Sequence, residues 1–289
     1  IIDHHQIDKP FPKANSIINP KKDNGYIKYD YMCATSLTYF FLDLLIDKLN
    51  IKTNFILENF MIYVLLATVC DVMPLRFLNR IIAIKTLNKF QLNNVTPIKK
   101  IYEILDIKKR ISIDDLGYLI GPILNSGGRL SKSNYATELL STNNEKNMTS
   151  IINKLIKLNE QRKKIEQKIL EEIDFNKIEK ENKKIIIIYK LNLNEGLIGI
   201  IAARLKEYFN KPVIVITNSN DFLKGSARST PNFDIGLAIN NAFDQKLIIS
   251  GGGHKMAAGF SLKKTKLKDF IKHMNMLYSK DNFNNKKNL

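Results

Sequence analysis

The chain contains no tryptophan and only two cysteines, and it has no long apolar run. Cys33 and Cys70 form no Cys-x-x-Cys pair, which excludes a disulfide framework and a thiolate zinc cage and fits a reducing compartment. No stretch approaches the roughly 18 consecutive apolar residues that a membrane span requires, and no basic segment followed by an apolar one opens the chain. We therefore expect a cytoplasmic protein with no membrane partner.

Arginine is scarce although the chain is strongly basic. The 289 residues include 45 Lys and Arg against 28 Asp and Glu, a net charge of +17, yet only seven of the basic residues are Arg. Such a charge fits a nucleic-acid surface, but a Lys-, Asn- and Ile-rich composition is also what an AT-rich genome produces. The positions of the few arginines are therefore a better guide to function than the total charge.

The composition and the spacing of apolar residues predict a folded α/β protein of two domains. Hydrophobic residues make up 44% and charged residues 25%, the usual globular mixture. The first residues, Ile1-Ile2, are typical of the end of a buried strand, and no Met precedes them, so we expect the chain to be a fragment. Helical spacing dominates up to residue 141, a long connector helix follows at about 145–173, and strands then alternate with helices. The expected divisions are 1–144, 145–180, 181–279 and a frayed tail at 280–289.

The triplet Asp3-His4-His5 is the first candidate site. Following a buried strand, it places imidazole and carboxylate groups at the carboxyl end of that strand, where open α/β sheets bind ligands. Histidine with carboxylates suits Mn²⁺, and a second histidine can contact the substrate or leaving group. The alternative is a pair of exposed loop histidines.

Asp71 is the second candidate, because it closes the apolar run 64–70. A carboxylate in this position is either a solvated residue at a helix end or a ligand held rigidly at the rim of the core. Spacing alone does not connect Asp71 to His4.

Three glycine-rich segments are candidates for phosphate binding. The run Gly251-Gly252-Gly253-His254 can expose backbone amides as an anion-binding nest, or it is an ordinary turn. Ser226 and Arg228 follow Gly225 at an expected strand end, and Arg129 closes a predicted tight glycine loop at 121–130. Either arginine could instead lie in a surface turn and form a salt bridge. Residues 194–199 open a helix whose amides can face a phosphate.

In this order the segments resemble the DHH phosphoesterase superfamily, and most closely the RecJ family of single-strand-specific 5′→3′ exonucleases. The resemblance spans residues 1 to about 265, and the Gly-Gly-Gly-His-x-x-Ala-Ala-Gly segment is the most specific part of it, marking the DHH-associated domain. It rests on residues 3–5, 67–75, 121–130, 194–204, 225–229 and 251–259.

The resemblance implies roles for these residues. His4 and Asp71 would be metal ligands, Asp3 a ligand or a residue that orients one, and His5 a contact to the scissile phosphate or leaving oxygen. Two Mn²⁺ or Mg²⁺ ions would serve phosphodiester hydrolysis in DNA repair and recombination. Arg129, Ser226, Arg228, Gly252, Gly253 and His254 would hold the substrate. The implied partners are single-stranded DNA, a helicase and a single-strand-binding protein.

The chain departs from the family pattern in four respects. Ser126-Gly127 stands where small Ala residues are usual, and Leu193 where an aromatic residue or His is common. The Asp-rich motifs that precede the DHH motif and the oligonucleotide-binding barrel that follows in RecJ are not in the chain, so we expect this fragment by itself to be inactive. Two alternatives stay open: a phosphodiesterase for short oligonucleotides or cyclic dinucleotides, and a non-catalytic nucleic-acid-binding relative.

Overall fold

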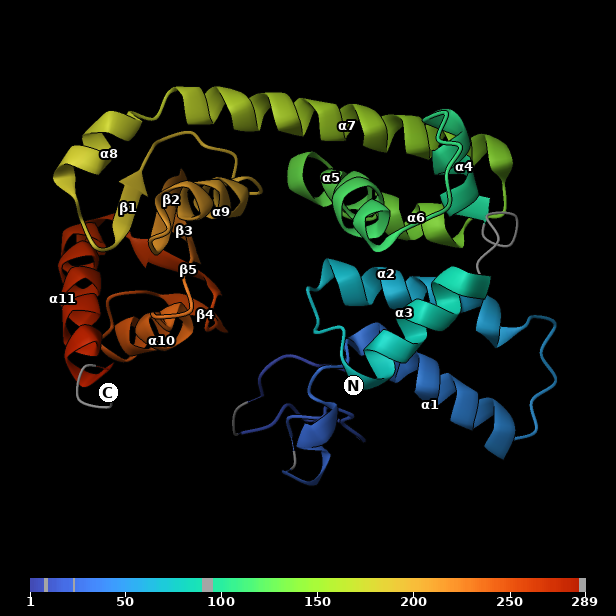
Figure 1. Cartoon of the computed structure of the whole chain (residues 1–289). Helices are drawn as coiled ribbons and strands as arrows, with labels where there is room; N and C mark the ends of the chain where they lie inside the picture. The colour runs from blue at the N-terminus through green and yellow to red at the C-terminus, as the bar shows by residue number, and fades with distance from the viewer. Residues whose placement is uncertain (8–9, 23, 90–95, 286–289) are drawn as a thin grey trace. The chain divides into compact units, whose positions relative to one another are not determined.

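The computed structural model describes residues 1–7, 10–22, 24–89 and 96–285 (Figure 1). The chain divides into two compact units, one of residues 1–127 and 133–157, the other of residues 128–132 and 158–289. The division falls inside the long helix α7 (Glu145–Glu171). The mixed helix and sheet class predicted from the sequence is confirmed.

Unit 1 is built from helices. Its strand content among the described residues is one parallel bridge, between Ile2 and Ile18. The elements are η1 (Asn24–Tyr29), α1 (Ala34–Lys48), η2 (Leu57–Phe60), α2 (Met61–Cys70), α3 (Phe77–Lys89), α4 (Thr96–Ile104), η4 (Asp115–Ile120), α5 (Gly121–Leu130), α6 (Tyr135–Ser141) and the first part of α7.

Helix α2 is the centre of the unit 1 core. Its residues 62, 64, 65 and 66 are all buried, as expected of a helix that is apolar on nearly every face. They pack with buried side chains of α4, η4, α6 and α7, among them Ile98, Leu116, Leu139 and Ile152. Because α2 is enclosed, its C-terminal residue and Asp71 after it are held in a fixed place.

The tight glycine loop predicted at 121–130 is a helix instead. The π-helical segment η4 runs directly into α5, and Gly127 and Gly128 lie within that helix. Gly121 is required by a close approach, because a Cβ there would lie 2.7 Å from Cys70 Sγ. Gly121 therefore allows α5 to approach the end of α2, and Gly127 and Gly128 are not part of a turn.

Unit 2 contains a five-stranded sheet in the order β1-β2-β3-β5-β4. Strands β1 and β2 are parallel, and the other neighbours are antiparallel. The strands are β1 (Ile186–Tyr189), β2 (Val213–Ser219), β3 (Phe222–Arg228), β4 (Ser250–His254) and β5 (Ala257–Lys263). The helices are the second part of α7, α8 (Phe175–Glu181), α9 (Ile198–Phe209), α10 (Ile235–Asp244) and α11 (Leu267–Asn285), with η5 (Lys264–Lys266) before α11.

Helices cover both faces of this sheet, and the central strand shows why. Val213 and Val215 of β2 pack toward α9 and the end of α7, whereas Ile214 and Ile216 pack toward α10 and α11. All four are fully buried, which explains why β2 is a continuous apolar run rather than an alternating one.

The triple glycine and the C-terminal tail both differ from the structures predicted for them. Residues 250–254 form the edge strand β4, and no described glycine has a positive φ, so the triple glycine is neither an anion-binding nest nor a turn. A nest needs successive amides in alternating helical conformations, and an extended strand points them in opposite directions.

The tail expected from residue 280 is helical as far as Asn285, because α11 continues to that point. Residues 286–289 lie outside the described residues.

Candidate functional site

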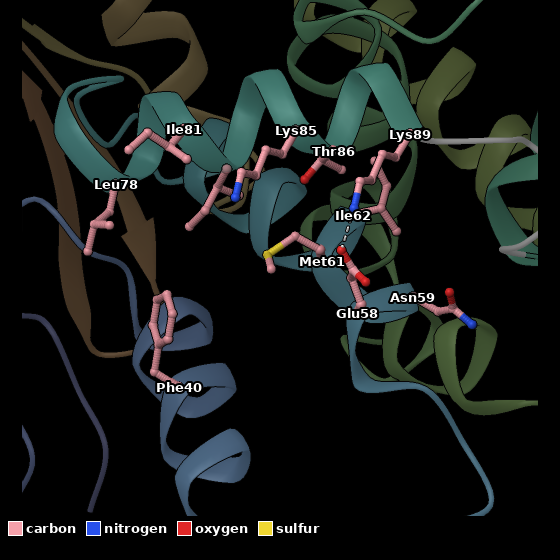
Figure 2. Close-up of a pocket in the computed structure, with 11 residues that line it drawn as sticks. Phe40, Glu58, Asn59, Met61, Ile62, Leu78, Ile81, Lys85, Thr86 and Lys89 are labelled. Carbon is pink, nitrogen blue, oxygen red and sulfur yellow. Dashed lines mark hydrogen bonds and ion pairs between the residues drawn. The ribbon is translucent and has the colours of Figure 1, made fainter.

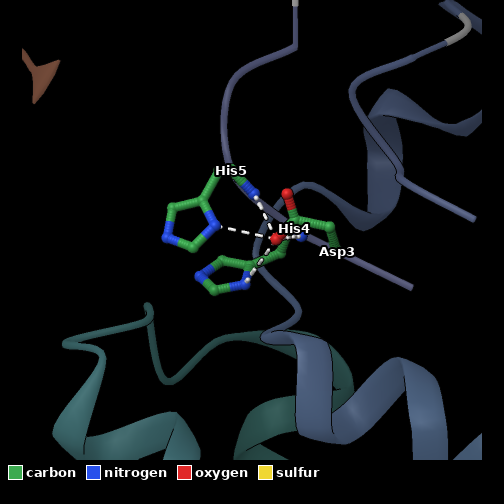
Figure 3. Close-up of side chains that lie close together, drawn as sticks. All are labelled: Asp3, His4 and His5. Carbon is green, nitrogen blue, oxygen red and sulfur yellow. Dashed lines mark hydrogen bonds and ion pairs between the residues drawn. The ribbon is translucent and has the colours of Figure 1, made fainter. Parts of the chain in front are cut away.

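Asp3, His4 and His5 form a compact cluster in unit 1 (Figure 3). One oxygen of Asp3, Oδ1, accepts hydrogen bonds from the backbone amides of His4 and His5, at 2.8 and 3.4 Å, and lies 2.7 Å from His5 Nδ1. The two imidazole rings are 4.5 Å apart. One ligand atom from each residue lies within 4.8 Å of the others, so the triplet is a candidate metal site rather than two unrelated loop histidines.

Neighbouring segments hold this loop in place. The side-chain Nδ2 of Asn19 donates to the carbonyl of His5 at 3.0 Å, and Lys21 Nζ donates to the carbonyl of His4 at 2.7 Å. The amide of Ala34, at the start of α1, donates to His4 Nδ1 at 3.2 Å. These contacts direct the other ring nitrogen of His4, Nε2, toward Asp71.

The structure brings Asp71 to His4, which spacing alone did not establish. Asp71 follows the last residue of α2, and its Oδ2 lies 3.8 Å from His4 Nε2. His4 is largely buried, with 13% of its side chain exposed, whereas Asp71 is 47% exposed. The arrangement therefore has a covered imidazole on one side and a carboxylate open to solvent on the other.

Burial and hydrogen bonding have opposite effects on this cluster. Burial lowers the pKa of His4 below its usual value, although the Asp71 carboxylate acts in the other direction. Burial raises the pKa of Asp3, but hydrogen bonds from His5 and His4 outweigh it, so the Asp3 pKa lies below its usual value. A neutral imidazole beside ionised carboxylates is the donor set that Mn²⁺ and Mg²⁺ accept, so the residues present fit such an ion.

A second candidate site is a cavity of about 620 Å³ in unit 2. It lies between the end of α5, the turn before α9 and strands β3, β4 and β5. Ser226 and Arg228 reach it from alternate positions of β3, and Arg129 reaches it from α5. The structure thus brings together three of the residues predicted to bind substrate.

The two arginines are half-buried and lack a carboxylate partner within 4 Å among the described residues. Arg129 Nη1 donates to the carbonyl of Gly196 at 2.8 Å, and Arg228 Nη1 donates to the carbonyl of Ala227 at 2.8 Å. Burial lowers the pKa of Arg228, and repulsion from Arg129 lowers it further. An anion between the two guanidiniums would relieve this repulsion, so the cavity is a candidate anion site.

Gly196, in the turn before α9, and Gly199, in the first turn of α9, make room for these arginines. A Cβ on Gly196 would lie 2.4 Å from the carbonyl oxygen of Arg129, and one on Gly199 would lie 3.1 Å from Arg228 Nη2. The segment 194–199 leads into α9, as expected, and it also forms part of the cavity wall.

Gly252, Gly253 and His254 are placed differently from Arg129 and Arg228. They lie in β4, they are exposed, and they are not among the residues that line the cavity, although Gly251 is.

Lys224 also lies on the cavity wall, and the sequence analysis missed it. Its Nζ pairs with Glu195 Oε2 at 2.5 Å. The period of two in Lys224-x-Ser226-x-Arg228 is the signal that could have identified Lys224.

A hollow of about 430 Å³ in unit 1 contains none of the predicted site residues (Figure 2). Apolar side chains from α1, α2 and α3, such as Phe40, Met61 and Ile81, line most of it. At one end Lys89 pairs with Glu58 at 3.0 Å, which neutralises both charges. The other polar residues that line this hollow are Asn59, Lys85 and Thr86.

The mixed sheet with helices on both faces makes unit 2 an α/β domain, and the arginine-lined cavity is its candidate site for an anion. Residues 182–280 match the DHHA1 domain family. Over nearly its whole length the chain is also similar to single-stranded-DNA-specific exonucleases named RecJ. The resemblance inferred from the sequence is confirmed: the chain is a relative of the RecJ exonucleases.

Two sequence comparisons carry this conclusion, and a solved structure shows the same fold. RecJ of Salmonella typhimurium is 31% identical and RecJ of Escherichia coli 30%, each over 93% of this chain and 50% of the relative. The crystal structure of Thermus thermophilus RecJ in complex with Mn²⁺ superposes with a TM-score of 0.81 at 22% identity, covering 96% of this chain and 40% of that one. The chain thus spans about half the length of the curated relatives it matches.

Proposed function

We propose that this chain is part of a metal-dependent exonuclease that hydrolyses single-stranded DNA from the 5′ end in repair and recombination. The observation that carries the proposal is the half-buried pair Arg129 and Arg228 in one cavity with Ser226. Paired guanidiniums and a hydroxyl suit successive phosphates of a strand, and such contacts bind the backbone without reading its sequence. The similarity to RecJ supplies the class of nucleic acid.

The Asp3, His4, His5 and Asp71 cluster is the proposed hydrolytic centre. His4 and Asp71 would hold Mn²⁺ or Mg²⁺, with Asp3 as a ligand or as the group that orients His5. The bound ions, two in the complete protein, would supply an activated water and stabilise the charge that develops on the phosphate. His5, 64% exposed, can approach the scissile phosphate or the leaving oxygen. Solved RecJ structures contain Mn²⁺ or Mg²⁺, which supports this metal assignment.

The remaining assignments belong to the same proposal. Residues 1–144 would be a DHH phosphoesterase domain, 145–180 the connector, and 181–279 the DHH-associated domain, whose Gly252, Gly253 and His254 extend the substrate surface along β4. Cytoplasmic location fits the two free cysteines. A helicase and a single-strand-binding protein are the proposed partners. Among the helices that the structure describes, none has the length and apolarity needed to cross a bilayer.

The test compares substrates with the full-length gene product in Mn²⁺. A long single strand carries a label at either end, and a duplex and a trinucleotide are assayed in parallel. We expect early release of the 5′ label from the single strand and no attack on the duplex. Preference for the trinucleotide would identify a short-oligonucleotide phosphodiesterase, and binding without cleavage would identify a non-catalytic relative; either result contradicts the proposal.

A further inference from the structure

A buried cluster of charged side chains joins α7 to α9 within unit 2. Glu166 on α7 is 7% exposed and Arg162, one turn earlier, is 9% exposed. Glu166 Oε2 accepts from Arg162 Nη1 at 2.7 Å, and its Oε1 accepts from Arg204 Nε, on α9, at 2.9 Å. Asn159 accepts from Arg162 Nε at 3.1 Å. Since each oxygen of Glu166 binds a different arginine, this one carboxylate ties the two helices together.

Helix α9 and the turn before it also fix the positions of the cavity residues Arg129 and Arg228. The turn before it supplies the Gly196 carbonyl that binds Arg129, and its first turn places Gly199 against Arg228. Arg204 lies five residues after Gly199 on the same helix. Because a helix moves as a rigid body, a shift of α9 along α7 would displace the contacts of both cavity arginines together.

Charge adds to this mechanical connection. Burial and the nearby Arg162 guanidinium lower the pKa of Arg129, whereas the Glu166 carboxylate acts in the opposite direction. The negative charge of Glu166 therefore offsets the repulsion between the Arg129 and Arg162 guanidiniums.

We propose that Glu166 is a positioning residue for phosphate binding: by bridging Arg162 and Arg204 it sets the place of α9, and through α9 the place of Arg129 and Arg228. Glu166 does not touch the substrate and acts only through these arginines. The inference rests on the proposed function of the cavity.

Three single variants separate positioning from general stability. Glu166→Gln keeps the shape of the side chain and removes its charge, but it leaves the buried Arg162 without a counter-ion. Arg204→Gln is the milder variant, because Arg204 is 58% exposed and Glu166 keeps its bond to Arg162. Glu207→Gln is the matched control, since Glu207 also pairs with Arg204, at 3.6 Å, but is 59% exposed.

Binding of the 289-residue chain to an oligothymidylate is measured for each variant, beside its melting temperature. We expect Arg204→Gln and Glu166→Gln to weaken binding by roughly 3- to 30-fold, and Glu207→Gln to leave it unchanged. In an Arg129→Ala background, Arg204→Gln should have little further effect, because the residue through which it acts is gone. Arg204→Lys, which keeps a cation near Glu166, should restore part of the affinity.

A spectroscopic signature checks the same point without DNA. The chain has only seven arginines, so the side-chain Nε–H resonance of Arg129 can be assigned with Arg129→Lys. It should shift in Arg204→Gln and remain in place in Glu207→Gln. If the unmodified chain fails to bind the oligothymidylate, the proposed function is wrong and this inference with it. Suppose instead that the unmodified chain binds normally. The positioning role alone is then overturned if Glu207→Gln loses as much affinity as Arg204→Gln, or if the losses from Arg204→Gln and Arg129→Ala simply add.

Discussion

Arg228 is the residue whose contribution to substrate binding is most directly measurable. Its guanidinium lies in the cavity beside Ser226 Oγ, at 3.3 Å, and has no carboxylate partner among the described residues. Arg228→Ala should weaken single-strand binding and reduce the slope of log affinity against log salt concentration by roughly one, because one phosphate contact is lost. Arg110→Ala, an exposed arginine of unit 1, is the control. An unchanged slope would show that Arg228 makes no phosphate contact.

Two adjacent glycines of β4 differ in what surrounds them, although the sequence treats them alike. A Cβ on Gly253 would lie 2.3 Å from the carbonyl oxygen of Ala257, whereas one on Gly252 would meet nothing within 4 Å. Gly253→Ala should therefore lower the free energy of unfolding by about 1–3 kcal/mol through overpacking. Gly252→Ala should leave it unchanged and, if β4 borders the substrate as proposed, weaken single-strand binding. Denaturant unfolding and a binding titration on both variants test this contrast; equal destabilisation would contradict it.

At the scale of elements, the π-helix η4 depends on a buried carboxylate at its first residue. Asp115 Oδ2 accepts from the backbone amide and the hydroxyl of Ser112, at 3.0 and 2.7 Å, and Oδ1 pairs with Lys109 Nζ at 2.7 Å. Burial raises the pKa of Asp115, but hydrogen bonds from Lys109 and Ser112 outweigh it, so the pKa lies below its usual 3.8. The ionised carboxylate therefore stabilises the folded state above pH 3.8, and this contribution is lost as the pH falls through the lower folded value.

The corresponding variant is Asp115→Asn. We expect it to cost about 1–3 kcal/mol of unfolding free energy near neutral pH, since a buried charged acceptor is lost. The difference from the unmodified chain should narrow as the pH is lowered toward 3, because that chain then loses the same charge. Urea unfolding at several pH values measures it, with the exposed Asp106→Asn as control. A difference that stays constant down to pH 3 would rule out this account.

The structure also explains two departures from the family pattern, one in α5 and one before α9. Ser126, where small Ala residues are usual, is fully buried, and its hydroxyl lies within hydrogen-bonding distance of the carbonyls of Ile123 and Leu155, at 2.7 and 2.8 Å. Leu193, where an aromatic residue or His is common, is buried in the unit 2 core. Neither residue lines the cavity, so their roles in this chain lie in packing and hydrogen bonding within the core of each unit.

For the whole molecule, the placement of the two candidate sites in different units predicts that mutations can separate the proposed hydrolysis from the proposed binding. The proposed metal ligands lie in unit 1 and the arginine pair in unit 2, and each unit has its own core. In the full-length gene product, Asp71→Asn should abolish Mn²⁺-dependent hydrolysis and leave single-strand affinity within about two-fold, because only a metal ligand changes. Asp47→Asn, an exposed carboxylate of α1, is the control. Simultaneous loss of hydrolysis, affinity and thermal stability would instead assign Asp71 a role in folding.

Most elements of this protein follow from local patterns. The apolar run of β2, the helical spacing of α1 and α7, and the order of strands and helices in unit 2 are all readable from residue periodicity. The chemical character of Asp3-His4-His5 and of Arg228 is likewise evident from residue type and neighbours. These features depend on interactions between residues close in sequence, so the sequence alone predicts them.

Other features needed the folded chain, because they depend on contacts between residues far apart in sequence. The approach of His4 to Asp71 and the meeting of Arg129 with Arg228 join segments that no spacing rule connects. The glycine-rich segments were misread for the same reason: residues 121–130 and 251–253 suggest turns by composition, whereas they form a helix and an edge strand in which Gly121, Gly251 and Gly253 allow close packing. Only the tertiary structure shows which of these glycines faces a close neighbour and which, like Gly252, faces open space.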